Sequence, residues 1–174
     1  MKSLVEHLSA YASYHRDRRN VATHFVGIPL IVVGVEAFLA RASVDVTRGV
    51  RVSLASVATA VAVAFYIALD RRFGLAMAAL LVLALAAGGE IASQATSVWL
   101  LVAAALFVGG WAAQFVGHAF EGRKPAFVDD LAGLLVGPLF LVAEAAFALG
   151  WRSDVHAAIL RRGAVRSSAQ NALP

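Results

Sequence analysis

The stretch that decides the fold is YHRDRRNVATHFVGIPL, residues 14–30, where a polar, basic segment runs into a long apolar one. It places His15, Asn20 and His24 at that border. Polar side chains are costly to desolvate at the edge of an apolar segment, so they call for an explanation. A second stretch, QFVGHAFEGRKPA at residues 114–126, places His118 at the end of another apolar run. We therefore treat the two stretches as partners.

The composition predicts an integral membrane protein. Hydrophobic residues make up 60% of the 174 residues and charged residues 15%, and the mean hydropathy is +0.76. Soluble domains usually carry about 25% charged residues, so this chain has too few to cover a water-facing surface. The length suits a single membrane domain over residues 1–152, which begins with an amphipathic segment. Residues 153–174 form a basic, polar tail that we expect to fray.

The charge and the motif content exclude several functions. The net charge is +4, but the arginines lie between apolar runs, which favours contact with lipid headgroups over nucleic acid. The chain has no cysteine, so disulfides, thiolate metal sites and a cysteine nucleophile are excluded. No P-loop, GxGxxG, GxSxG or HExxH motif is present, so the common nucleotide-binding and hydrolase functions have no support.

Apolar runs of near-membrane length predict an all-α bundle of four to five hydrophobic helices. An amphipathic interfacial helix is expected within residues 1–20, before the first run. The last run is broken by Gly137-Pro138 and Glu144, so it crosses the membrane, is re-entrant or lies along the interface. The runs cover residues 21–40, 52–69, 73–89, 98–120 and 131–151.

The positive charges predict the topology. The N-terminus, Arg71-Arg72, Arg123-Lys124 and the tail favour the cytoplasmic side, and residues 90–97 favour the other side. Five crossings would place the tail outside, whereas four crossings with a re-entrant last run would keep it inside. In both schemes the two histidine stretches lie on the cytoplasmic side.

Helical geometry places several polar residues on common faces. Gln114, His118 and Glu121 follow the i, i+4, i+7 pattern of a single stripe, and Asn20 shares a face with His24. His15 precedes His24 by nine residues, which puts the two about 180° apart on a straight helix. They can serve one ion only if the chain bends between them, for which the arginine-rich junction is suited, or if other helices complete the site.

These patterns support a metal site of His15, His24 and His118, with Glu121 as a fourth, oxygen ligand or as a hydrogen-bond partner of the ligands. Such a site suits Fe(II), Zn(II), Mn(II) or Cu(II), and spacing alone does not choose among them. The alternative for each histidine taken singly is an interfacial residue that faces headgroups. Glu36 and Glu144 lie inside apolar runs, where pairing with a polar group of a neighbouring helix is expected. His7 and His156, near the chain ends, are expected to be solvated.

The two stretches carry a resemblance to a known family. H-x4-N-x3-H-x2-G-I-P-L at residues 15–30 and Q-F-V-G-H-x-x-E-x-R-K-P-A at residues 114–126 resemble the two signatures of the Mpo1-like family. The run GPLF at residues 137–140, with Glu144, is similar to the family's C-terminal segment. The resemblance extends over about residues 11 to 150, and the motifs occur in the same order as in the family.

The resemblance implies a multi-pass membrane enzyme, an Fe(II)-dependent dioxygenase that uses O2 to shorten 2-hydroxy fatty acids by one carbon in α-oxidation. It implies iron ligands at His15, His24 and His118, and ligand or partner roles for Asn20, Gln114 and Glu121. The basic residues at the membrane border are candidates to hold the substrate carboxylate. They are Arg16, Arg19, Arg123 and Lys124.

Two alternatives remain at this point. One is another metal-dependent enzyme on the same scaffold, such as a zinc lipid hydrolase. The other is a non-enzymatic transporter or membrane scaffold, although that function favours polar residues along the bilayer midplane, whereas the clusters here lie at the ends of apolar runs. Richness in Ala, Val and Arg favours a bacterial source, and hence the bacterial inner membrane as the location.

Overall fold

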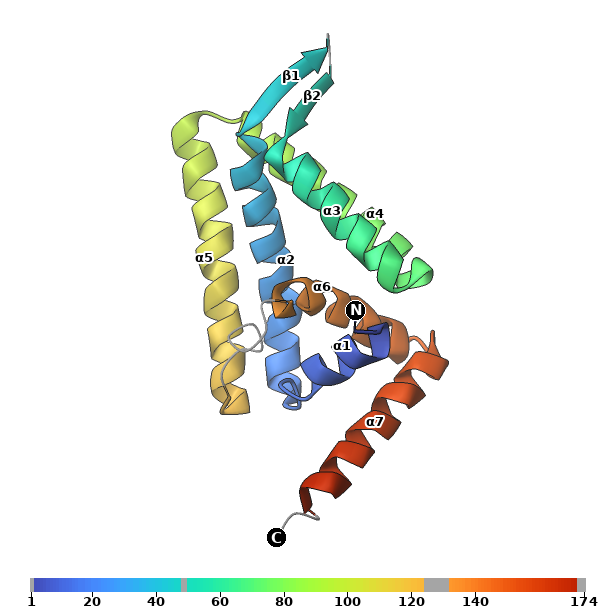
Figure 1. The fold of residues 1–174 in the computed structure, drawn as a ribbon. Helices are drawn as coiled ribbons and strands as arrows, with labels where there is room; N and C mark the ends of the chain where they lie inside the picture. Colours follow the sequence, from blue (N-terminus) through green and yellow to red (C-terminus); the bar gives the residue numbers. More distant parts are fainter. Residues whose placement is uncertain (1, 48–49, 124–131, 172–174) are drawn as a thin grey trace.

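The computed structural model describes residues 2–47, 50–123 and 132–171, and in this part of the chain it has seven helices and one two-stranded hairpin (Figure 1). The class predicted from the sequence, an all-α membrane bundle, is confirmed. The small hairpin, between the first two predicted apolar runs, is an addition. The elements are α1 (Leu4–Ala12), α2 (Arg18–Ala40), β1 (Ser43–Thr47), β2 (Val50–Ser53), α3 (Leu54–Leu69), α4 (Arg71–Ser93), α5 (Thr96–Glu121), α6 (Gly133–Ala148) and α7 (Ser153–Asn171).

Three helices among the described residues, α2, α4 and α5, are long and apolar enough to cross a membrane. Helix α3 is apolar but has only 16 residues. Helix α6 and the first part of α7 pass the same test only as a pair bent by 111°. The bend follows from left-handed backbone at Gly150 (φ 74°) and Arg152 (φ 58°). Helix α6 runs through Gly137-Pro138 and Glu144, so the break predicted there was wrong; it lies after α6, and the bent pair has the form of a broken span or of a re-entrant loop.

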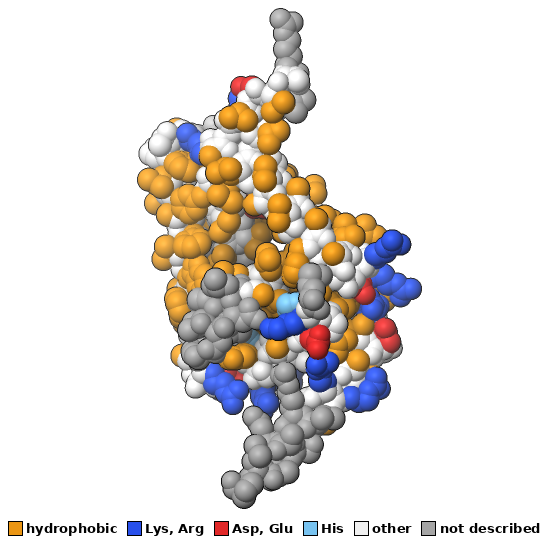
Figure 2. Space-filling model, viewed as in Figure 1, with side chains coloured by type: hydrophobic (Ala, Val, Ile, Leu, Met, Phe, Trp, Pro, Cys, Tyr) orange, Lys and Arg blue, Asp and Glu red, His pale blue; other side chains and the backbone are white. Residues whose placement is uncertain are grey.

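The long helices bring the two histidine stretches to one end of the molecule. Figure 1 shows α2 and α5 side by side and antiparallel, with α3 and α4 as a second hairpin inclined to them. Because α2 begins where α5 ends, residues 15–24 and residues 114–121 meet at the lower end in this view. Lys and Arg side chains gather around that end in Figure 2, while hydrophobic side chains cover much of the upper part.

Helix α1 and the tail are more deeply integrated than the sequence suggests. Leu8 and Tyr11 of α1 are buried in a core shared with Phe140 of α6. His7, expected to be solvated, is 8% exposed and sets its ring edge against Phe65. The tail, expected to fray, forms helix α7 and contacts α1. Short polar sequences of this kind look like solvent-facing segments until tertiary contacts recruit them.

Glycines let α2 and α5 approach closely. A methyl group added to Gly110 would lie 2.7 Å from the carbonyl oxygen of Gly27 and 2.9 Å from the backbone nitrogen of Ile31. Such contacts are closer than van der Waals packing allows, so the two backbones touch where these glycines face each other. Gly109, the next residue on α5, faces outward, and an added methyl group would meet no described atom within 4 Å.

Gly110→Ala should therefore destabilise the bundle, whereas Gly109→Ala should not. Overpacking against rigid backbone costs about 1–3 kcal/mol, while replacing an exposed helical glycine gains roughly 0.5–1 kcal/mol. Thermal unfolding of the two variants in the same detergent checks this, with a lower midpoint expected for Gly110→Ala alone. Equal midpoints would contradict the close approach of α2 and α5.

Candidate metal centre

The chain bends at the predicted junction. Helix α1 ends at Ala12 and α2 begins at Arg18, so the intervening residues turn between the two helices. The side chain of Asp17 caps α2 by accepting a hydrogen bond from the backbone N–H of Arg19 at 2.8 Å. On a single straight helix His15 and His24 would point apart. The break between α1 and α2 instead brings His15 back towards His24.

The three histidines form one buried cluster. His15, His24 and His118 are 5%, 1% and 6% exposed. Each offers a ring nitrogen such that these atoms all lie within 4.8 Å of one another. The ring centroids are 4.5 to 5.1 Å apart, and each pair of rings meets edge to face. Among the described residues, these three histidines are the group of side chains that could hold a metal ion.

Hydrogen bonds determine which ring nitrogens carry protons. Nδ1 of His15 lies 2.9 Å from the carbonyl oxygen of Tyr11, and Nδ1 of His24 lies 2.8 Å from that of Asn20. A carbonyl oxygen can only accept, so both Nδ1 atoms donate, and each neutral ring has its lone pair on Nε2. These two Nε2 atoms are 3.0 Å apart. Nδ1 of His118 is also buried and forms no hydrogen bond among the described residues.

This arrangement fits a metal ion. Two lone pairs facing each other at 3.0 Å repel, and a cation between them removes the repulsion. Two imidazole nitrogens that bind one metal at about 2.0–2.1 Å are separated by roughly 3 Å when the bonds are near right angles. Carbonyl partners on the outer ring nitrogens are also what metal-binding histidines commonly have, because they fix the tautomer and the ring orientation.

The surroundings of His15 keep it neutral. Burial lowers its pKa to about 4, against the smaller opposing effects of the hydrogen bond to Tyr11 and the charge of Glu121. The ring of Tyr11 stacks on that of His15, with centroids 4.1 Å apart and planes within 6°. Burial also raises the pKa of Tyr11, so its phenol stays protonated. The imidazole is thus held in the form that binds a cation.

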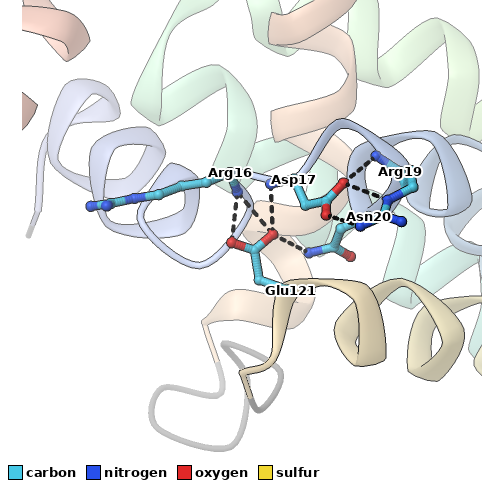
Figure 3. A network of polar contacts seen from close by, with 5 residues as sticks. All are labelled: Arg16, Asp17, Arg19, Asn20 and Glu121. Carbon is cyan, nitrogen blue, oxygen red and sulfur yellow. Dashed lines mark hydrogen bonds and ion pairs between the residues drawn. The ribbon is translucent and has the colours of Figure 1, made fainter.

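Glu121 lies beside the cluster and is engaged elsewhere (Figure 3). Its carboxylate accepts hydrogen bonds from the backbone N–H of Arg16 at 3.0 Å and of Asp17 at 2.8 Å. It also accepts one from the side-chain amide of Asn20 at 3.1 Å. The structure therefore gathers three of the four predicted metal ligands and places the fourth, Glu121, as a clamp on the turn that carries His15.

Asn20 and Gln114 are buried next to the histidines. Asn20 is fully buried, and its Oδ1 forms no hydrogen bond within the described residues, nor does Nε2 of Gln114. Gln114 lines a cavity of about 70 Å³ together with His24, His118 and Trp111. Buried polar atoms without partners are rare and mark places where a ligand or water completes the hydrogen bonding. This cavity is therefore the candidate place for a polar ligand group.

The predicted carboxylate-binding residues have varied positions. Arg19 pairs with Asp17 at 2.8 Å and lies over the ring of Phe120, 4.6 Å from its centroid. Arg123 donates to the carbonyl oxygen of Ser13 at 3.2 Å, which ties the end of α5 to the same turn. Arg16 contributes its backbone N–H, and Lys124 lies outside the described residues.

Glu36 behaves as expected of an intramembrane carboxylate. It accepts a hydrogen bond from the hydroxyl of Thr59 on α3 at 2.7 Å and is 5% exposed. Its backbone and Cβ pack against Gly88 of α4. The expected pairing of Glu36 with a neighbouring helix is confirmed. Glu36 lies far along α2 from His24.

Tyr11 is the site residue that sequence reasoning did not select. It stacks on His15, its carbonyl oxygen fixes the His15 tautomer, and its side chain lines the small cavity. Phe140 of α6 packs against both rings. The available signal was the i, i+4 spacing of Tyr11 and His15, which places both on one face of a helical turn.

The fold and the cluster define a helical membrane protein with a buried three-histidine site, suited to a metal ion, at one end of its bundle. The chain belongs to the Mpo1-like family, because residues 1–149 match the family model described as 2-hydroxy-palmitic acid dioxygenase Mpo1-like. It is 30% identical over 154 residues to the 2-hydroxy-palmitic acid dioxygenase of Saccharomyces cerevisiae. That match covers 87% of this chain and 84% of the yeast protein. No solved structure matches the chain.

Glu121→Gln should loosen the turn that carries His15. The glutamine amide keeps one oxygen and sets N–H donors against the N–H groups of Arg16 and Asp17, at a cost of about 1–2 kcal/mol. Hydrogen exchange at these two amides should accelerate roughly tenfold, since 1.4 kcal/mol corresponds to that factor. Glu90→Gln, at an exposed carboxylate of α4, is the matched control. Unchanged exchange in Glu121→Gln would show that the carboxylate does not hold this turn.

Proposed function

We propose that this chain is a membrane-bound, Fe(II)-dependent dioxygenase that shortens 2-hydroxy fatty acids by one carbon. The observation that carries the proposal is the convergence of three buried imidazoles, with Nε2 of His15 and His24 only 3.0 Å apart. Membership of a family described as 2-hydroxy-palmitic acid dioxygenases supports the reaction class. Neutral imidazoles suit a non-haem iron, and open positions on such an ion admit both substrate and O2.

His15, His24 and His118 are the residues that would hold the iron. When bound, the ion would supply the O2 chemistry and a place for the hydroxyl and carboxylate of the substrate. Glu121 and Asn20 keep the ligands in place. Glu121 accepts hydrogen bonds from the turn that carries His15, and the carbonyl oxygen of Asn20 accepts one from the ring of His24. We assign Glu121 to this positioning role and not to the ligand set, since its oxygens already accept backbone hydrogen bonds.

The small cavity is the proposed place of the substrate head. It is lined by Tyr11, His24, Gln114 and His118, so a polar group there is beside two of the three histidines. The unpartnered amide of Gln114 is a donor suited to a carboxylate or hydroxyl. Arg19 and Arg123, at the same end of the bundle, add positive charge that attracts the carboxylate towards the site.

The membrane position agrees with this chemistry. Both histidine stretches lie at the end around which Lys and Arg gather in Figure 2, and such residues are enriched on the cytoplasmic side. We propose that the protein lies in the bacterial inner membrane with its site at the depth of the cytoplasmic headgroups. A fatty acid in the bilayer presents its carboxyl group at that depth.

Metal and oxygen measurements test the function. The purified protein should contain about one iron per chain and consume O2 when 2-hydroxypalmitate is added. His24→Ala and His118→Ala should lose the iron and reduce turnover by roughly 100-fold or more. His156→Ala, whose ring stacks on Phe147 away from the cluster, should retain both.

Other outcomes would point to other functions. Turnover of 2-hydroxypalmitate by iron-free protein would refute the proposal. Zinc in place of iron, with release of a lipid product and no O2 uptake, would indicate a hydrolase on the same scaffold. Neither metal nor turnover, with altered membrane flux in the histidine variants, would indicate a transporter.

A further inference from the structure

A second cavity is larger than the one beside the histidines. It has a volume of about 460 Å³ and lies between α2, α4 and α6. Every described side chain that lines it is apolar: it is bounded by α2 from Phe25 to Val33, by α4 from Met77 to Ala87 and by α6 from Pro138 to Ala145. Its volume is in the range of about 300–1,000 Å³ that is typical of small-molecule sites. An apolar space of this size suits a hydrocarbon ligand.

The larger cavity adjoins the histidine site. Ile28, Val32 and Pro138 line both this cavity and the small one that contains His24 and His118. The two spaces therefore share a wall that joins α2 to α6, which cross at this level in Figure 1. A molecule with a polar head in the small cavity has an apolar space next to it for its chain.

The larger cavity is open on one side and ends at a helix contact. Leu80 and Leu83, on its α4 wall, are 50% and 67% exposed, so the cavity opens on a face of the helices that lipid would cover. Beyond Ala84, α2 and α4 come together, since a methyl group on Gly88 would lie 2.6 Å from Cβ of Glu36. From Met77 to Ala87 the wall covers about 15 Å of helix, at about 1.5 Å per residue.

We propose that this cavity binds the acyl chain of the 2-hydroxy fatty acid, and that Ala84 determines how long a chain it accepts. The inference rests on the proposed function, which supplies the substrate class. Ala84 is buried, lines the cavity and lies one turn before the Gly88–Glu36 contact, so it faces the part of the cavity where α2 and α4 close. A small residue there leaves room that a larger side chain would fill. The open side admits the substrate from the bilayer.

Photolabelling of the wild-type protein tests the location of the chain. The probe is 2-hydroxypalmitate with a diazirine on its terminal carbon, and adducts are mapped by mass spectrometry. Label on Leu81 or Ala84, displaced by excess 2-hydroxypalmitate, is expected. Label confined to outward positions such as Leu101, which is 71% exposed, would overturn the proposal. Displacement by phosphatidylglycerol but not by 2-hydroxypalmitate would also overturn it, because the occupant would then be a bilayer lipid.

Ala84→Phe and Ala86→Phe form a matched pair on one helix. Ala86 is exposed and does not line the cavity. In Ala84→Phe, kcat/KM for 2-hydroxypalmitate should fall about tenfold or more relative to that for 2-hydroxydecanoate, because the filled pocket rejects the longer chain. Ala86→Phe should leave the ratio unchanged. An unchanged ratio in Ala84→Phe would overturn the role of this residue.

The two proposals fail in different ways. Labelling depends on binding and not on turnover, so it reports on the cavity even if the protein oxidises no 2-hydroxy acid. Absence of turnover with label in the cavity would refute the dioxygenase and support the acyl site. Turnover with label only on the outer surface would support the dioxygenase and refute the acyl site. Labelling of the wild-type protein also covers the case in which Ala84→Phe does not fold.

Discussion

The carboxylate of Glu121 accepts hydrogen bonds from a turn that has no helical ladder of its own. Arg16 and Asp17 lie between two helices, and their backbone N–H groups need acceptors. A negative charge there also faces the start of α2, where the helix dipole favours it. His15 is carried by this turn. Its approach to His24 and His118 therefore depends on the contact of Glu121 with the turn, which involves neither of those two rings. Without the clamp, His15 would be held by its contacts with Tyr11 and by the hydrogen bond from Arg123 to Ser13.

The packing of α2 against α5 sets the other half of the geometry. Gly27 and Gly110 let the two backbones touch, and Gly117 lies against the side chains of Asn20 and Thr23. Side chains from both helices therefore come within ligand distance of one another without having to span a wide gap between the helices. Short side-chain spans limit rotamer freedom, so the three imidazoles are held close together, with Nε2 of His15 and of His24 3.0 Å apart.

The sequence was most informative where geometry left few choices. His15 and His24 point apart on a straight helix, which predicted either a bend between them or a site completed by other helices, and the structure has both; apolar run lengths predicted the bundle. The role of Glu121 was not predictable, because a carboxylate three residues after a histidine suits a metal ligand and a backbone clamp equally well. His7 and α7 were misread for a different reason. His7 is buried against Phe65, and α7 packs against α1. Both contacts join segments that are distant in sequence, so they cannot be predicted from the polarity of the local sequence.

The contacts between Glu121 and Arg16 join residues 105 positions apart. His15 is synthesised before Glu121 and His118, which follow only after α2, α3, α4 and most of α5 have been made. Closing so long a loop is slow and follows the local pairing of helices. The nascent N-terminal segment thus offers only scattered imidazoles, and a complete three-histidine site is a product of the nearly finished bundle. A metal ion could therefore be held by all three imidazoles only after α5, the third of the long apolar helices, has been made.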